Sequence, residues 1–205
     1  MEKQINLKHK IGKGISPRQF IEGMRVRTME LSLIPNTKER MIANYEHFTW
    51  PNEEDRKFFS GLGEHFNLVC LILCTDWCPD VIWNVPVLFR TMEEAGIPTE
   101  VLIMEDHMET MDLFLTDGGR AQPIAIWVES SSGIVLGRWG ARPAYIQEVM
   151  DRFKRENPDK EASDYQEKLN GTYREIGGLY HNGLQYQKVM IQELKELLAS
   201  FGQVD

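Results

Sequence analysis

The residue with the clearest chemical potential is Cys78, in the segment Trp77-Cys78-Pro79-Asp80. The continuous apolar run Leu68–Cys74 before it is typical of a buried strand, and apolar residues recur at helical spacing after it. We therefore expect the thiol where a strand ends and a helix begins. The unpaired backbone N–H groups and the positive dipole end of a helix favour a thiolate, which is the nucleophile in disulfide exchange.

The residues beside Cys78 have two interpretations each. A carboxylate at Asp80 stabilises the first turn of a helix, yet its charge raises the pKa of a neighbouring thiol. Asp80 is then either a proton acceptor for Cys78 or only a helix cap. Trp77 is either a flat wall beside a substrate or a ring packed in the core.

The other cysteines, Cys70 and Cys74, lie on the expected strand. Cys74 is either a resolving partner for Cys78, if their Cα atoms come within about 7 Å, or a small buried apolar residue. A strand spreads Cys70 and Cys74 over about 13 Å, so we expect no metal site. Three cysteines do not make a disulfide framework and fit a reducing compartment.

The elements around Cys78 alternate between strand and helix, which predicts an α/β fold with a mixed sheet and helices on both faces. The expected order is a strand at Leu68–Cys74, a helix through Val81–Met92 closed by Gly96, a strand at Thr99–Met104, a helix through Met108–Leu115 ending at Gly118-Gly119, strands at Pro123–Val128 and Ile134–Trp139, and a closing helix through Tyr145–Phe153.

Helical segments flank this middle zone, so we expect three parts, with boundaries at 1–66, 67–156 and 157–205. In the first part, capping signals at Ser16-Pro17, at Thr37 or Asn36, and at Asn52 predict three helices. The last part is expected to be a helical hairpin broken at Gly177-Gly178 and Asn182-Gly183. Its apolar face packs on the main domain, or packs on a second subunit as a homodimer, or forms a groove for a partner protein.

The middle zone resembles the thioredoxin family over residues 67–156. Trp77-Cys78-Pro79-Asp80-Val81 is similar to the motif Trp-Cys-x-x-Cys, with Val81 in place of the second cysteine. It also resembles a branch of the family that has the motif Trp-Cys-Gly-Asp, with Asp in the third position counted from the cysteine, and Gly-Arg before the cis-proline. Further matching positions are Pro86 in the helix, Gly119-Arg120, Gln122-Pro123 at the family's cis-proline, Gly133, and Trp139-Gly140-Ala141.

This resemblance implies a thioredoxin-like thiol–disulfide oxidoreductase acting through a single cysteine. Cys78 would attack a protein disulfide or a low-molecular-weight disulfide, Gln122 and Pro123 would hold the substrate backbone, and Trp77 would border the site. A small thiol, or else Cys74, would resolve the product. Three departures limit the comparison: Val81 replaces the resolving cysteine, Ile72 occupies the position of the family's buried acid, and the family's first strand is not evident.

Two alternatives stay open beside the oxidoreductase. One is a non-catalytic thioredoxin-fold adaptor that binds a protein partner, and the other is a peroxide-sensing thiol. Arg120 and Arg142 either attract the carboxylates of an acidic thiol or are solvated.

The composition excludes several classes of function. A formal charge of −8 without a basic patch argues against nucleic-acid binding. The longest apolar run is too short to cross a bilayer, and Met1–Lys13 has no apolar core of a secretory signal. We expect a cytoplasmic protein.

No phosphate-cradling glycine loop is present in the sequence, so we expect neither a nucleotide nor a metal cofactor.

Overall fold

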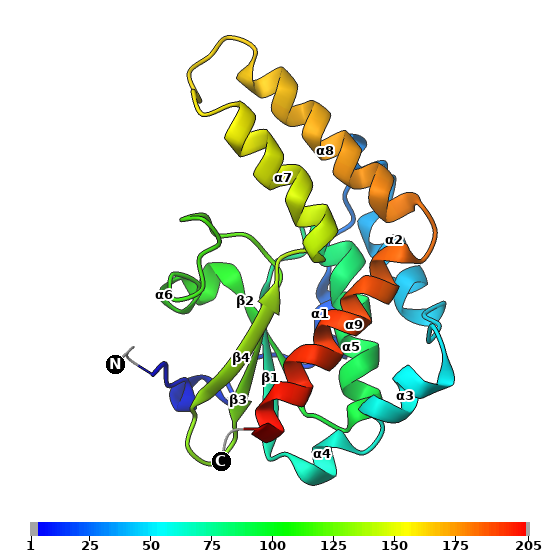
Figure 1. The fold of residues 1–205 in the computed structure, drawn as a ribbon, viewed down its shortest axis with the longest axis vertical. Coiled ribbons are helices and arrows are strands. Elements are labelled where there is room, and N and C mark those ends of the chain that lie inside the picture. Colours follow the sequence, from blue (N-terminus) through cyan, green and yellow to red (C-terminus); the bar gives the residue numbers. More distant parts are fainter. Residues whose placement is uncertain (1–3, 204–205) are drawn as a thin grey trace.

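A mixed four-stranded sheet forms the centre of the computed structural model, which describes residues 4–203 (Figure 1). Residues 1–3 and 204–205 lie outside the described residues. They are the outer ends of the first and third expected parts, and residues 1–3 are also the start of Met1–Lys13. The strands are ordered β2-β1-β3-β4, with β1 parallel to β2 and antiparallel to β3, and with β3 antiparallel to β4. The bounds of the strands are Leu68–Cys74 (β1), Thr99–Ile103 (β2), Ile124–Glu129 (β3) and Val135–Gly140 (β4). The predicted α/β fold is confirmed.

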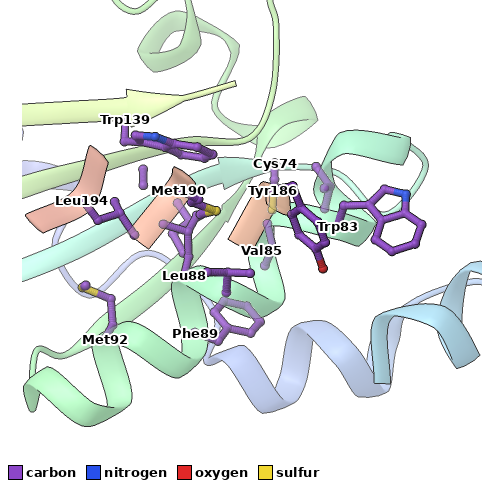
Figure 2. Packing of buried hydrophobic residues seen from close by; sticks show 14 of the residues in the cluster. Cys74, Trp83, Val85, Leu88, Phe89, Met92, Trp139, Tyr186, Met190 and Leu194 are labelled. Atoms are coloured by element: carbon purple, nitrogen blue, oxygen red, sulfur yellow. The ribbon is translucent and has the colours of Figure 1, made fainter. Parts of the chain in front are cut away.

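The central strand β1 is buried along its whole length because both faces of the sheet are covered. Successive side chains of a strand point to opposite faces. Leu71 and Leu73 enter one apolar cluster with Phe114, while Cys70 and Cys74 enter the larger cluster on the opposite face. Figure 2 shows that larger cluster, in which side chains from α5 and α9 meet Cys74 and Trp139.

Helix α5, Pro79–Ala95, follows β1 and carries Cys78 at its N-cap position. Proline at the first helical position has a suitable fixed φ, and Gly96 ends the helix in the left-handed conformation with a φ of 66°. The predicted strand–helix junction at Cys78 is therefore confirmed. Most of α5 is buried, which fixes the position of its N-terminus.

The helix expected through Met108–Leu115 is much shorter than predicted. A 3-10 turn at Met104–Asp106 leads into α6, which spans only Met108–Met111. The chain then turns so that Phe114 is buried beneath the sheet while Leu113 stays exposed, and Asp117 takes a positive φ of 49°. A continued helix would not bring this segment to the start of β3.

The N-terminal segment is helical, as predicted, and its caps are the expected ones. The side chains of Ser16, Asn36 and Asn52 each accept a hydrogen bond from the backbone N–H three residues later. Helix α2 lies along α5 on one face of the sheet. The elements are η1 (Lys8–Lys10), α1 (Pro17–Gly23), η2 (Glu30–Ser32), α2 (Thr37–Glu46), α3 (Glu53–Phe59) and α4 (Leu62–His65).

Three helices and a final turn complete the chain: α7 (Ala144–Glu156), α8 (Tyr165–His181), α9 (Gln185–Ser200) and η4 (Phe201–Gln203). Helix α8 runs antiparallel along α7 and reaches η2, whereas α9 packs on α5 and β4 (Figure 1). The apolar face of α9 is thus covered within the chain. No helix among residues 4–203 is long and apolar enough to span a membrane.

The break predicted at Gly177-Gly178 is wrong, because α8 continues through both residues. The break at Asn182-Gly183 is confirmed, with Gly183 at a φ of 69°. Gly177 has a packing role instead: a Cβ atom there would lie 3.1 Å from the Cα atom of Ser32. The missing side chain lets α8 approach η2 closely.

The two adjacent glycines of α8 provide a matched test of this contact. A Cβ at Gly178 meets nothing within 4 Å, so we expect Gly178→Ala to raise the free energy of unfolding by about 0.5–1 kcal/mol. Gly177→Ala should gain less or lose stability, because η2 must shift. Urea denaturation of both variants measures the difference, and equal gains would contradict the close packing of α8 on η2.

Candidate functional site

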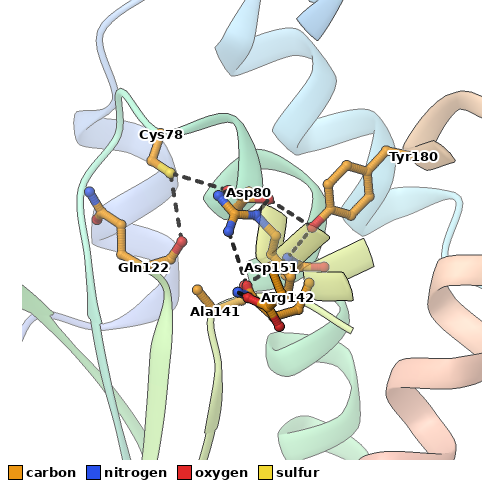
Figure 3. Close-up of polar contacts among 9 residues, drawn as sticks. Cys78, Asp80, Gln122, Ala141, Arg142, Asp151 and Tyr180 are labelled. Atoms are coloured by element: carbon orange, nitrogen blue, oxygen red, sulfur yellow. Dashed lines mark hydrogen bonds and ion pairs between the residues drawn. The ribbon is translucent and has the colours of Figure 1, made fainter. Parts of the chain in front are cut away.

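The thiol of Cys78 lies between the N-terminus of α5 and the segment that opens β3 (Figure 3). The side chain is half-buried, and its Sγ atom is 3.6 Å from the carbonyl oxygen of Gln122 and 4.0 Å from Oδ2 of Asp80. The Gln122-Pro123 peptide bond is cis. The structure therefore brings Cys78, Asp80 and the Gln122-Pro123 segment together.

Asp80 is held in a buried network that was not predicted from the sequence. Arg142 donates from Nε to Oδ1 at 2.9 Å and pairs through Nη2 with Oδ2 at 2.8 Å. The Tyr180 hydroxyl also donates to Oδ1, at 2.9 Å, and accepts a hydrogen bond from Asn84 Nδ2 at 2.8 Å. Both carboxylate oxygens are thus occupied by donors, and Arg142 is not a solvated residue.

The network extends from α5 to three other elements. Asn84 Nδ2 also donates to the carbonyl oxygen of Ala141, at 3.1 Å, and Arg142 Nη1 donates to Gln147 Oε1 of α7, at 3.1 Å. Tyr180 belongs to α8 and stacks on Trp83 of α5, with ring centroids 5.6 Å apart. The contacts of Asp80 therefore tie the N-terminus of α5 to the segment after β4 and to α7 and α8.

The surroundings of Cys78 keep its thiol protonated. Burial is the largest cause and, together with the charge of Asp80, raises the pKa of Cys78 to about 12. The backbone N–H groups of Asp80 and Val81 and the charge of Arg142 lower the pKa, but by less. The N–H groups at the helix terminus do favour a thiolate, as expected, but burial and the neighbouring carboxylate outweigh them.

Cys70 and Cys74 are fully buried on β1, and none of the three cysteines forms a disulfide. Burial raises the pKa of Cys74 well above its ordinary value, with smaller contributions from the charges of Glu105 and Asp76. These observations favour the interpretation of Cys74 as a core residue. Within residues 4–203, no three His, Cys, Asp or Glu side chains are placed to hold a metal ion.

Trp77 is an exposed wall of the site and not a core residue. Its side chain is 47% exposed, and its indole N–H donates to Glu105 Oε1 at 2.7 Å. The residue before it, Asp76, accepts a hydrogen bond from the backbone of Arg25 and forms an ion pair of 2.8 Å with Arg27. These bonds join the loop before Cys78 to the N-terminal segment.

A pocket of about 500 Å³ opens beside Cys78 and Asp80. Its walls come from four places in the chain: η2, the N-terminus of α5, the segment between β4 and α7, and α8. Gln122 and Pro123 do not line it. The lining residues are mostly apolar or aromatic: Met29, Glu30, Leu31, Ser32, Trp77, Cys78, Pro79, Asp80, Trp83, Arg142, Tyr173, Ile176, Gly177 and Tyr180.

The buried pair between Asp80 and Arg142 should be costly to break on one side. We expect Arg142→Met to lower the free energy of unfolding by about 3–5 kcal/mol, because Asp80 would keep an uncompensated buried charge. The double variant Asp80→Leu/Arg142→Met removes both charges and should be more stable than Arg142→Met alone. Urea denaturation measures both, and a loss below about 1 kcal/mol for the single variant would contradict a buried ion pair.

Comparison with known proteins supports the sequence resemblance. A family model described as Thioredoxin matches residues 27–154, more than half of the chain. No curated protein matches. Two solved structures share the fold over 96% of this chain. One is a protein of unknown function, PA1234, from Pseudomonas aeruginosa, which is 12% identical, is covered over 98% of its own length and has a TM-score of 0.57. The other is an HIV epitope scaffold, which is 14% identical, is covered over 99% of its own length and has a TM-score of 0.53. The strand–helix junction at Cys78, the cis peptide before Pro123 and the family match agree, and the chain belongs to the thioredoxin family.

Proposed function

We propose that this protein is a thioredoxin-fold binding protein that takes a ligand into the pocket beside Cys78, without turning over disulfides. The observation that carries the proposal is the position of the Cys78 thiol, which faces the Asp80 carboxylate while Arg142 is already bound to that carboxylate. The charge of Arg142 lowers the pKa of the thiol by less than burial and Asp80 raise it, and the pocket offers an apolar binding surface.

The raised pKa makes Cys78 a weak nucleophile at neutral pH. Because burial and the charge of Asp80 raise the pKa of Cys78, a much smaller fraction of this thiol than of a free cysteine is ionised at pH 7. The higher basicity of the thiolate recovers only about half of this loss on a logarithmic scale. Cys78 should therefore react more slowly than a free cysteine at neutral pH, which suits a binding site better than a redox enzyme.

The chain also offers no evident resolving thiol. Val81 occupies the position of the second motif cysteine and is fully buried, and Cys74 is enclosed in the core on β1. A mixed disulfide formed at Cys78 would have to wait for an external thiol. This supports a role without disulfide turnover, and the three free cysteines fit the cytoplasmic location that we propose.

Monothiol thiol–disulfide exchange is the second candidate, favoured by the position of Cys78 at a helix N-terminus beside the cis-proline segment. In that reaction the Cys78 thiolate attacks one sulfur of a substrate disulfide and the S–S bond breaks. A mixed disulfide forms, and the other sulfur leaves as a thiolate that takes a proton from solvent. A small thiol then releases Cys78 by a second exchange.

A disulfide-turnover assay separates the two candidates. We expect the intact protein, Cys78→Ser and Cys74→Ser to give the same background rate with hydroxyethyl disulfide and reduced glutathione, and with insulin and dithiothreitol. The reason is the protonated Cys78 thiol and its lack of a resolving partner. An ordinary dithiol thioredoxin, run in parallel, shows that the protein-disulfide assay responds.

A rate above background that is lost in Cys78→Ser and kept in Cys74→Ser would overturn the binding proposal and establish the monothiol enzyme. If Cys74→Ser also lost the rate, Cys74 would be the resolving residue.

A further inference from the structure

Among residues 4–203, the cationic side chain that lines the pocket beside Cys78 is Arg142, and it is already paired. The guanidinium of Arg142, whose side chain is 12% exposed, donates to both oxygens of Asp80 and to Gln147. The other charged side chain that lines the pocket is Glu30, which is exposed at the rim. A ligand therefore meets one compensated ion pair and one negative charge.

Most of the remaining lining is apolar or aromatic. Leu31 of η2 and Ile176 of α8 contribute aliphatic surface, and Trp77, Trp83 and Tyr173 contribute rings. A volume of about 500 Å³ lies inside the range of about 300–1,000 Å³ that is usual for small-molecule sites. The size and the lining both suit one compact apolar molecule.

We propose that the occupant of this pocket is a small apolar molecule without an anionic group. The inference rests on the proposed function, because it takes the pocket as the binding site. A carboxylate or sulfonate entering the pocket would lose its hydration without gaining a cationic partner, and Glu30 would repel it. An apolar group gains from the same desolvation.

This inference departs from the acidic thiol considered from the sequence. Arg120 pairs with Asp112 in a bidentate contact, at 2.6 and 3.0 Å, and does not line the pocket. Arg142 lines the pocket, but its guanidinium is already paired with the Asp80 carboxylate. Neither arginine is available to hold the two carboxylates of a glutathione-like ligand.

A pair of dyes with one aromatic skeleton tests the proposal. N-phenyl-1-naphthylamine is neutral, and 8-anilinonaphthalene-1-sulfonate adds a sulfonate to the same skeleton. At equal concentrations, we expect the neutral dye to slow the alkylation of Cys78 by iodoacetamide at least tenfold more than the anionic dye does. Mass spectrometry of the Cys78 peptide, at a pH of about 9 to speed the reaction, gives the rate.

Charge reversal at the rim provides the matched control. Glu30→Lys should raise the protection that the anionic dye gives, whereas Glu39→Lys makes the same change of charge on α2, away from the pocket, and should not. Equal or stronger protection by the anionic dye in the intact protein would overturn the inference, and so would protection by neither dye. Both outcomes are distinguishable from failure of the proposed function, which is judged by disulfide turnover.

Discussion

The buried ion pair between Asp80 and Arg142 is the constraint on which the rest of the site depends. Taking two charges out of water is favourable only when they are paired and their remaining hydrogen-bonding groups are satisfied. Here Tyr180 and Gln147 supply the further partners. The arrangement fixes three segments around the first turn of α5, and it places the Asp80 carboxylate 4.0 Å from the Cys78 thiol.

The pocket is a product of the family fold and of what is added to it. The family match ends at residue 154, before α8 begins, so Tyr173 and Tyr180 lie outside the matched region. Gly177 lets α8 approach η2, and the ion pair between Asp76 and Arg27 holds the N-terminal segment near the loop that carries Cys78. The helices that flank the sheet thus enclose one side of the site.

Much of the fold was predictable because its signals are local. The apolar run of β1, the glycine that closes α5 and the caps at Ser16, Asn36 and Asn52 each depend on a few adjacent residues. The length of α6 was not predictable, because Phe114, just after it, is buried in a cluster with Leu71 and Leu73, which are distant in the sequence. The role of Gly177 depends in the same way on η2, which is distant in the sequence.

The site was predictable in its members but not in its electrostatics. The motif indicated Cys78, Asp80 and the cis-proline segment, and the structure brings them together. Tyr180, however, lies 100 residues from Asp80 along the chain, and no local pattern marks it as a partner. The sequence showed the helix terminus that lowers the pKa of a thiol, while the burial that raises it depends on the folded chain.

The most direct test is the pH dependence of Cys78 alkylation, followed by mass spectrometry with Cys78→Ser as the blank. Because burial and the charge of Asp80 raise the pKa of Cys78 to about 12, the account predicts a rate that rises about tenfold per pH unit through pH 10 without a plateau. A plateau at or below the free-cysteine value of about 8.5 would contradict it and would show an activated thiolate at Cys78.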